Sequence, residues 1–349
     1  MAQPASRTPV SSSAQSQDPP RRGFPAPDDN IDMTAAFIGI DWGTTHRRAA
    51  LIAADGTLLG ERADGEGALA CKGRFRESLQ ALVAGWPDAS PALPVVMAGM
   101  VGAAIGWQAV SYLEGDTALS DLPRHLTPVA DTPAGCRWFI APGWCLRGEG
   151  GVVDVMRGEE TQLFGALHAL GPDASDGCYV LPGTHSKWVR LHAGRITELR
   201  TYMTGELFAL LRQHGTLASA MQTTGAGEAA GVNHDSVADN PDFLRGVAEA
   251  ARGPVLTNAL FGARARVVTG AMAPGAAAAY VSGLLIGAEW ADAQRLASRD
   301  DPVRVIGEPA LAALHAACAR VHDRRLETLD ARQIQLAAWR AMAAEEIHA

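Results

Sequence analysis

Residues 37–63 read FIGIDWGTTHRRAALIAADGTLLGERA, and this stretch decides the fold. The apolar run FIGID at 37–41 predicts a buried strand that ends at a Gly-Thr turn. Residues 47–53 predict a second strand, and the DG pair at 55–56 is typical of a hairpin turn. Residues 57–63 predict a third strand, so we expect three antiparallel strands to open the folded part of the chain.

The same pattern returns at residues 179–200, which read YVLPGTHSKWVRLHAGRITELR. The Gly-Thr pair at 43–44 corresponds to the pair at 183–184, and the turn at 55–56 corresponds to the one at 193–194. A single strand–turn–strand unit of this kind is common enough to arise by chance. Two copies, each opening half of the chain, predict a duplicated fold.

Helices and strands predicted around the two hairpins complete an α/β pattern. The periodicity predicts helices at 73–85, 159–170, 203–214, 241–265, 276–299, 308–320 and 330–345. Buried strands are predicted at 94–98, before a glycine-rich loop at 99–106, and at 303–306, with short strands up to about residue 142 and a loop at 221–240. We expect mixed sheets flanked by helices, in an N-terminal domain at 35–175 and a C-terminal domain at 176–349.

The composition is that of a soluble globular protein, with 349 residues, 47% hydrophobic and 19% charged. The net charge of −8 argues against a nucleic-acid-binding surface, so an anionic ligand would need a local cationic or backbone site. The five cysteines form no C-x-x-C pair and are odd in number. They argue against a disulfide framework or a zinc site, and for a reducing compartment.

No segment of the sequence predicts targeting to a membrane or insertion into one. Residues 1–34 are rich in Ser, Pro, Ala and Gln and lack an apolar core, which predicts a disordered tail rather than a signal peptide. The longest apolar stretch, 276–288, is too short to cross a bilayer. We expect a cytoplasmic protein without membrane or nucleic-acid partners, and a homo-oligomer is compatible with the sequence.

Two short motifs have the chemistry of a phosphate site, DWGTT at 41–45 and PGTHSK at 182–187. The chain has no Walker loop, and no G-x-G-x-x-G follows a predicted strand. A Gly-Thr turn between antiparallel strands lets backbone N–H groups and hydroxyls face one set of phosphate oxygens. We expect a polyphosphate to be gripped from both sides by Gly43, Thr44, Thr45, Gly183 and Thr184.

Charged residues beside these motifs are further candidates. Lys187, with Arg47 or Arg48, would add positive charge. His185 either donates to a phosphate oxygen or is a half-buried turn residue. Asp41 ends a buried strand and is well placed to orient Mg²⁺ through water, since Mg²⁺ takes few protein ligands. The alternative for Asp41 is a turn-forming residue that caps its own backbone.

Longer strings make the combination specific. They are AGMVGAAIGW (98–107), VMRGEETQL (155–163), LPGTHSKWV (181–189), YMTGEL (202–207) and SGLLIGAE (282–289). In this order, within roughly residues 36–320, the chain resembles the 2-dehydro-3-deoxygalactonokinase family of the actin/hexokinase/heat-shock ATPase superfamily. The resemblance implies a duplicated ribonuclease H-like (actin-like ATPase) two-domain fold. The hairpins are similar to its phosphate 1 and phosphate 2 motifs, and VRVIGEP at 303–309 is similar to its adenosine motif, with Gly307 under the adenine and ribose.

The resemblance implies transfer of the ATP γ-phosphoryl group, with Mg²⁺, to the terminal hydroxyl of 2-dehydro-3-deoxy-D-galactonate. The product would be the 6-phosphate, formed in galactonate catabolism. A carboxylate must accept or orient the hydroxyl proton. Glu159 and Glu160 are candidates, and so is Asp41, although we assign Asp41 to the metal. Acids in a first helical turn also simply favour the helix dipole, so a structural role for the pair stays open.

Candidates for binding the sugar acid are Arg157, Gly102, Trp107 and Glu206. An arginine is the natural bidentate partner for the substrate carboxylate, although Arg157 could instead be a surface residue paired with a neighbouring Glu. Gly102 lies in the glycine-rich stretch and would allow close approach of a small ligand. Trp107, like Tyr112 after it, either lines the pocket or fills the core. Glu206 is a further candidate carboxylate.

Other functions stay open on the sequence. An actin-like ATPase acting on protein partners would share the hairpins, but we find no separate peptide-binding domain or filament insertion. A related kinase could take 2-keto-3-deoxygluconate or an amino sugar. A sugar-binding regulator is disfavoured because no helix-turn-helix-like or basic segment is present. The final segment, which includes Trp339, matches the family poorly, so its return to the first domain is open.

Overall fold

A computed structural model describes residues 35–86, 89–148, 151–221, 238–296, 298–299 and 301–345. Residues 33–349 belong to one compact unit. The predicted tail at 1–34 and most of the predicted loop at 221–240 lie outside the described residues.

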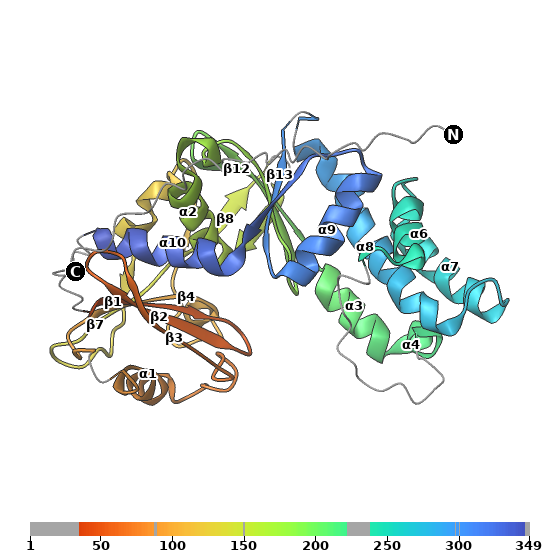
Figure 1. Ribbon diagram of the computed structural model, residues 1–349. Coiled ribbons are helices and arrows are strands. Elements are labelled where there is room, and N and C mark those ends of the chain that lie inside the picture. The colour runs from red at the N-terminus through yellow and green to blue at the C-terminus, as the bar shows by residue number, and fades with distance from the viewer. Residues whose placement is uncertain are drawn as a thin grey trace, which may run out of the picture. The chain divides into compact units, whose positions relative to one another are not determined.

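The first sheet contains the first predicted hairpin at one side. Its strand order is β3-β2-β1-β4-β7-β6 (Figure 1). Strands β1 (Ala35–Trp42), β2 (Arg47–Ala53) and β3 (Leu58–Asp64) are antiparallel, as predicted. Strand β4 (Pro94–Gly99) is parallel to β1, β7 (Arg137–Ile140) is parallel to β4, and β6 (Thr127–Pro128) is antiparallel to β7.

The second sheet repeats this arrangement. Its order is β12-β11-β10-β13-β14, and its strands are β10 (Gly177–Leu181), β11 (Ser186–His192), β12 (Arg195–Tyr202), β13 (Val303–Gly307) and β14 (Leu326–Asp330). Strand β11 pairs antiparallel with both β10 and β12, whereas β13 pairs parallel with both β10 and β14, as in β3-β2-β1-β4-β7. The duplicated α/β fold predicted from the two hairpins is therefore confirmed. Strand β14 was not predicted, because its sequence LETLD lacks a buried apolar run.

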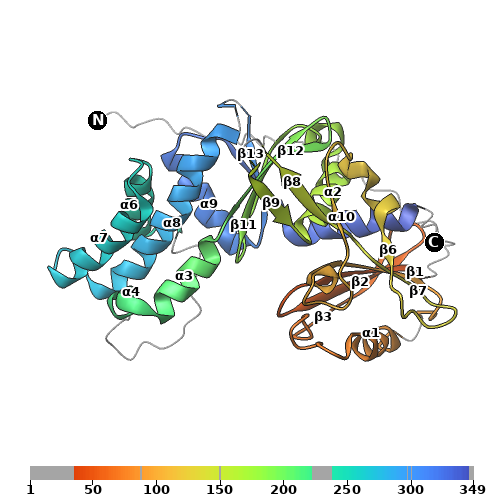
Figure 2. The same ribbon diagram turned by 180° about the vertical axis from the view of Figure 1, so that it is seen from behind.

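A small third sheet connects the first sheet to the second. It consists of β5 (Tyr112–Leu113), β8 (Gly143–Arg147) and β9 (Val153–Met156), and it leads directly into helix α2 (Glu159–Leu170). Strands β8 and β9 lie against β12 (Figure 2). The segment that precedes α2 is thus held beside the second hairpin.

The remaining helices mostly follow the predicted periodicity, although the one at 215–221 was not predicted and one predicted helix is interrupted. They are α1 (Phe75–Ala84), α3 (Thr204–Gln213), α4 (Gly215–Met221), α6 (Pro241–Ala250), α7 (Leu256–Val268), α8 (Ala277–Ala293), α9 (Pro309–Val321) and α10 (Ala331–Ala344). Short 3₁₀ helices include Met100–Gly102 and Leu119–His125. The single helix predicted at 241–265 is wrong, because Gly253 has φ +73° and Pro254 follows it, which separates α6 from α7.

Helices α2 and α10 share one apolar core with the facing sides of both sheets (Figure 1). Trp339 of α10 lies directly over Gly39 of β1, where a Cβ atom would overlap its indole ring. The opposite face of the first sheet packs on α1, and the opposite face of the second packs on α6, α8 and α9. The final segment therefore packs on the first sheet, which the sequence analysis left open.

Close packing of α6 on α8 explains the glycines of SGLLIGAE. A Cβ atom on Gly283 would overlap the carbonyl oxygen of Phe243, and one on Gly246 would overlap that of Tyr280. Helix α8 also carries Glu289, which is only 2% exposed. Its Oε2 accepts a 2.9 Å hydrogen bond from Trp188 Nε1 on β11. A buried carboxylate thus lies beneath the second hairpin.

Replacing Glu289 by Gln is expected to flatten the pH dependence of stability. Burial raises the pKa of Glu289 from 4.5 to about 7, so the folded protein binds more protons than the unfolded chain between these values. The free energy of unfolding of the wild type should fall as pH rises through this window, by about 3 kcal/mol from this group. Urea unfolding from pH 4.5 to 8 should show Glu289→Gln gaining stability relative to wild type as pH rises. The control Glu198→Gln, at an exposed position on β12, should track the wild type; parallel curves for Glu289→Gln and wild type would contradict the expectation.

Candidate active site

The first Gly-Thr turn, residues 43–46, is held from behind by the segment that follows β3. Gly43 N donates to His46 O at 3.0 Å, and Ala68 N donates to Gly43 O at 2.9 Å. Gly67 packs so closely that a Cβ atom there would overlap the Thr45 backbone. Thr44 and Thr45, predicted to face phosphate, are exposed.

The second turn, residues 183–185, has the same construction. Glu206 N donates to Thr184 O at 3.0 Å, and a Cβ atom on Gly205 would be 2.9 Å from Thr184 Cα. His185 Nε2 lies 2.5 Å from Glu206 Oε2. The structure therefore places Glu206, predicted to bind the sugar acid, against this turn at the start of α3.

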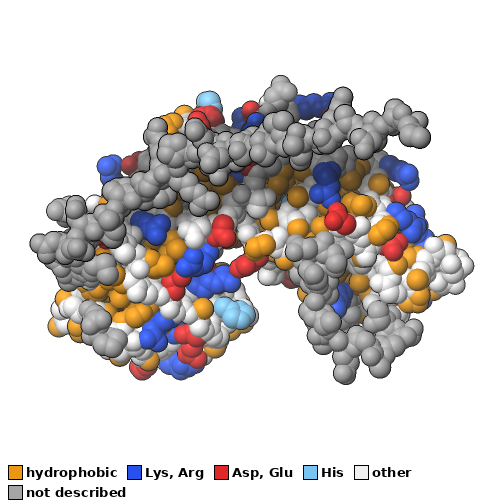
Figure 3. Space-filling model, in the orientation of Figure 1, with side chains coloured by type: hydrophobic (Ala, Val, Ile, Leu, Met, Phe, Trp, Pro, Cys, Tyr) orange, Lys and Arg blue, Asp and Glu red, His pale blue; other side chains and the backbone are white. Residues whose placement is uncertain are grey.

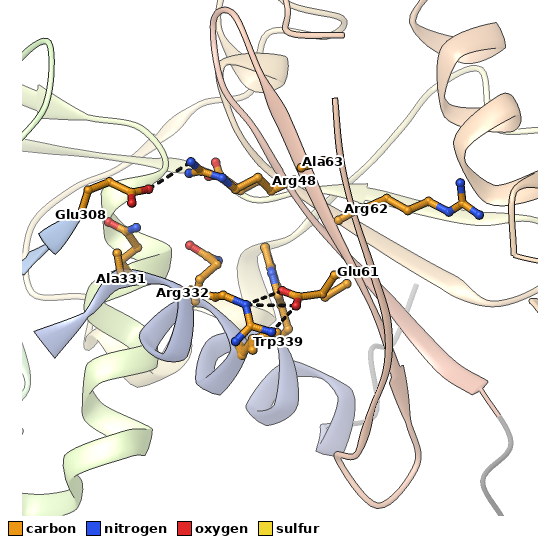
Figure 4. A pocket seen from close by; sticks show the side chains of 14 residues that line it. Arg48, Glu61, Arg62, Ala63, Glu308, Ala331, Arg332 and Trp339 are labelled. Carbon is orange, nitrogen blue, oxygen red and sulfur yellow. Dashed lines mark hydrogen bonds and ion pairs between the residues drawn. The ribbon is translucent and has the colours of Figure 1, made fainter. Parts of the chain in front are cut away.

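The arginine of the first hairpin that lines a cavity, described below, is Arg48. Arg47 is 3% exposed and points the other way, where it donates to Asp64 Oδ2 at 2.8 Å and to Ser78 Oγ at 2.9 Å. Its Nη1 and Nη2 are engaged within its own half of the fold, while its Nε is buried without a hydrogen-bond partner among the described residues. The structure therefore does not bring this guanidinium to the exposed side of the turn. Arg48 is exposed on β2 and donates to Glu308 Oε1 at 3.1 Å (Figure 4).

Lys187, which matches Arg48 in the register of the second hairpin, is by contrast buried, at 6% exposure. Its Nζ donates to Val155 O at 2.8 Å and to Thr201 Oγ1 at 2.9 Å. Gly307, predicted to lie under the adenine, ends β13, and a Cβ atom there would be 2.9 Å from Pro182 Cγ. The late glycine thus adjoins the start of the PGTHSK motif.

Two glycines bring the start of α2 to the ends of β1 and β4. Gly99 has φ +91° and Gly158 has φ +110°, a region that favours glycine. A Cβ atom on Gly158 would lie 3.3 Å from Gly99 Cα, and one on Gly99 would lie 3.5 Å from Asp41 Oδ1. Asp41 and the Glu159–Glu160 pair are therefore collected at one point, as the catalytic prediction requires.

Burial raises the pKa of each of these acids, and the charge of Glu159 adds to the rise for Asp41 and for Glu160. Burial raises the pKa of Asp41 to about 6, with Arg48 opposing and Glu159 reinforcing the rise. Burial and then the charge of Glu159 raise the pKa of Glu160 to about 8, against the Gly158 N–H that donates to both its oxygens at 2.8 Å. At neutral pH, Glu160 is mostly protonated.

Glu159 lies within electrostatic reach of both turns. Burial raises its pKa, while Lys187 and then the Arg157 N–H, which donates at 3.0 Å, lower it; His185 adds a smaller lowering effect. Glu159 also raises the pKa of Asp41 beside the first turn. Of Glu159 and Glu160, it is Glu159 that interacts electrostatically with charged groups beside both Gly-Thr turns.

Arg157 presents unused hydrogen-bond donors beside these acids. Its Nη2 donates to Val110 O at 2.7 Å, and its guanidinium carbon lies 4.4 Å from the centroid of the Tyr112 ring. Its Nε and Nη1 are buried and have no hydrogen-bond partner among the described residues. A Cβ atom on Gly102 would lie 2.9 Å from Nη1, so the two predicted sugar-acid residues are neighbours. Buried donors without partners are costly, and an anionic ligand would satisfy them.

Trp107 lies apart from this arginine. Its ring stacks on Phe75 of α1 at 6.0 Å between centroids and lies 5.8 Å from the ring of Trp138. It packs against the core on the α1 side of the first sheet. The structure therefore places Trp107 with the core aromatics, the second of the two roles that the sequence left open.

A cavity of about 440 Å³ opens between the first hairpin and the ends of α2, α9 and α10 (Figure 4). Asp41, Arg48 and Glu308 line it, together with Gln162, Arg332 and Gln335, which the sequence analysis missed. In Figure 3, acidic and basic side chains lie next to one another along the hollowed side of the first-sheet half. Gln162 follows Glu159 by one helical turn, a spacing that could have revealed it. Gln335 Nε2 is buried without a partner among the described residues.

The described residues contain no group of three or more His, Cys, Asp and Glu side chains arranged to hold a metal ion. Mg²⁺ keeps most of its waters and uses one or two carboxylates, so a half-buried Asp41 that lines the cavity, with Glu159 nearby, fits it. Across the described part of the chain, no helix is both long enough and apolar enough to span a bilayer.

Comparison with known proteins places this site in a family. The model of the 2-keto-3-deoxy-galactonokinase family matches residues 41–342. A probable 2-dehydro-3-deoxygalactonokinase of Rhizobium meliloti is 36% identical over 306 residues, which cover 86% of this chain and 94% of the relative. The 2-dehydro-3-deoxygalactonokinase of Escherichia coli is 35% identical over 282 residues, covering 80% and 88%.

A solved structure agrees with these relatives. The crystal structure of a Sinorhizobium meliloti protein given the same enzyme name superposes with a TM-score of 0.77 at 34% identity, over 88% of this chain and 95% of that one. The two phosphate-type turns, the clustered acids and the unpaired arginine thus occur in a chain whose relatives carry one enzyme name over nearly their whole length. The chain belongs to the 2-keto-3-deoxy-galactonokinase family.

Proposed function

We propose that this protein transfers the γ-phosphoryl group of ATP to the terminal hydroxyl of 2-dehydro-3-deoxygalactonate, as a step of galactonate catabolism. The observation that carries the proposal is the buried Arg157 fork with two unused donors, set beside Glu159 between the two turns. Phosphoryl transfer asks a protein mainly for positioning and charge compensation, and this site offers both.

ATP is proposed to bind across the two turns. The exposed Thr44 and Thr45 and the exposed Thr184 and His185 offer backbone and side-chain donors from opposite halves of the fold. Arg48 would exchange Glu308 for a phosphate oxygen, because both partners are exposed and their ion pair contributes little. Adenosine would lie toward Gly307, next to the second turn.

The sugar acid is proposed to bind through its carboxylate to Arg157. Nε and Nη1 form two parallel N–H donors, which match the two oxygens of a carboxylate. Gly102 leaves room beside Nη1, and Tyr112 supports the flat face of the guanidinium. This binding mode requires an acid and explains why a neutral sugar would be a poor substrate.

Glu159 is the proposed proton acceptor for the attacking hydroxyl. Glu160 is fully buried, and both of its oxygens face the Gly158 N–H, so it is less free to meet a substrate. Asp41 would hold Mg²⁺ through water, and the ion would neutralise charge on the transferred phosphoryl group. A protonated Glu160 would avoid adding a further negative charge to the site.

We further propose that the protein acts in the cytoplasm. Cys71, Cys136, Cys145, Cys178 and Cys318 are all free thiols, which suits a reducing compartment. Residues 1–34 contribute nothing to this proposal, and a homo-oligomer stays compatible with it.

A coupled assay of ADP release with Mg-ATP tests the function. We expect turnover to rise more than about tenfold with 2-dehydro-3-deoxy-D-galactonate over ATP alone, because substrate completes the site before transfer. The gluconate epimer serves as the comparison. Equal stimulation by both would keep the kinase and widen its substrate range. No stimulation by either, with steady background hydrolysis, would sink the proposal in favour of an ATPase acting on protein partners.

Arg157→Lys should raise KM for the sugar acid about 10- to 100-fold, because one bidentate charged interaction is lost. KM for ATP should change little, since Arg157 contacts neither turn directly. The matched control is Arg147→Lys on β8, where the arginine is exposed and pairs with Glu114. Steady-state kinetics against both substrates separate these outcomes. A rise in KM for ATP alone would overturn the assignment of Arg157.

Glu159→Gln should lower kcat by about 10²- to 10⁴-fold, the usual contribution of a general base. Glu160→Gln should retain more activity near pH 7, since wild-type Glu160 is mostly neutral there, and should differ from wild type chiefly above pH 8, where Glu160 ionises. The measurement is kcat and kcat/KM from pH 6 to 9. The reverse ranking, with Glu160→Gln inactive and Glu159→Gln active, would make Glu160 the base.

A further inference from the structure

Strand β9 is fastened to the second hairpin by side chains on both partners. The Asp154 carboxylate accepts from Thr201 N at 2.6 Å through Oδ2 and from Thr201 Oγ1 at 2.6 Å through Oδ1. One residue further along, Val155 O accepts from Lys187 Nζ at 2.8 Å. Thr201 Oγ1 also accepts from Lys187 Nζ at 2.9 Å. These contacts form a closed polar ring, which we call the β9 clasp: Asp154, Val155, Lys187 and Thr201.

Thr201 is the centre of the β9 clasp because its hydroxyl does two things at once. It donates to Asp154 and accepts from Lys187, so it is the one side chain that joins the carboxylate to the ammonium. Lys187 and Thr201 face each other across β11 and β12 in the sheet register. Losing this hydroxyl would leave a buried ammonium with one partner fewer, which is costly.

The two hairpins differ in the partners of their matching basic side chains. In the sheet register Lys187 pairs with Leu181 as Arg48 pairs with Asp41, so Arg48 occupies the matching position of the first hairpin. Arg48 is exposed and donates to Glu308, the N-cap residue of α9, at 3.1 Å. Lys187 instead shares an uncharged hydroxyl on its own hairpin and reaches across to the backbone of β9.

The β9 clasp connects the two ends of the proposed reaction. On one side, Asp154 and Val155 lead within a few residues to Arg157 and Glu159, at the proposed sugar-acid site. On the other side, Lys187 directly continues the second turn, the proposed phosphate site. If either the segment before α2 or the second turn moves, the hydrogen bonds of the β9 clasp must therefore break, or the other segment must move with it.

We propose that Thr201 is a positioning residue that couples binding of the sugar acid to binding of ATP. The inference rests on the proposed function, since it needs both ligands to bind where we place them. The β9 clasp makes the acceptor segment and the second turn move as one unit, so either ligand that orders one segment also prepares the other. Such coupling is reciprocal and typically amounts to about 5- to 150-fold in affinity.

The test compares Thr201→Val with Thr201→Ser in the full-length protein. Affinity for 2-dehydro-3-deoxygalactonate is measured by calorimetry with and without Mg²⁺ and a non-hydrolysable ATP analogue, and the reverse titration checks reciprocity. We expect a coupling of at least about fivefold in wild type, its retention in Thr201→Ser, which keeps the hydroxyl, and its loss in Thr201→Val. Thr197→Val, on the same strand outside the clasp, should behave as wild type.

Each result bears on one claim. Equal coupling in Thr201→Val and Thr201→Ser, or no coupling in wild type, would overturn the role of the β9 clasp while leaving the kinase intact. A wild type that binds and phosphorylates no sugar acid would overturn the proposed function instead. Should Thr201→Val fail to fold by circular dichroism, Asp154→Asn replaces it, because it removes the carboxylate that Thr201 requires, and the same loss of coupling is expected.

Discussion

The close approach of two backbone segments at Gly99 and Gly158 is the constraint on which the site depends. Side chains at either glycine would push the start of α2 away from the ends of β1 and β4. The contact brings the half-buried Asp41 and Glu159 and the buried Glu160 together. Burial raises the pKa of all three, and the charge of Glu159 adds to the rise for Asp41 and Glu160. Three clustered carboxyl groups of this kind have to be balanced by bound protons or by nearby cations.

The two halves of the duplicated fold have kept the same turn but differ in the charged residues beside it. Each half supplies a Gly-Thr turn backed by a closely packed glycine, Gly67 in one half and Gly205 in the other. Only the first half has an acid at the end of its central strand, since Asp41 is matched by Leu181. The second half instead uses its buried cation to reach the strand that precedes α2. One hairpin became the acidic side of the site, and the other became its link to the substrate segment.

Sequence patterns predicted most of the scaffold and only part of the site. The hairpins, α2 and the glycine-rich motifs were readable because each is a local pattern with its own geometric reason. The sequence could not show which of Arg47 and Arg48 faces the cavity. Neighbouring residues on a strand face opposite sides of the sheet, so a register shift of one residue would swap the two side chains. The neighbours of Trp107 and Glu206 were not readable for a similar reason, since adjacency in sequence does not fix the neighbours in space. Periodicity predicted helix α10 but not its packing on the first sheet, and the cavity residues Arg332 and Gln335 likewise depend on contacts between distant parts of the chain.

Packing of Trp339 onto Gly39 also bears on how the protein is made. The first sheet is among the earliest parts to leave the ribosome, yet its inner face is covered by α10, which is translated near the end of the chain. Synthesis proceeds at about 5–20 residues per second, so the nascent first sheet waits many seconds with apolar surface uncovered. The first half therefore cannot complete its packing until α10 has been synthesised, and a chaperone that shields this face during synthesis would cover the surface that α10 later covers.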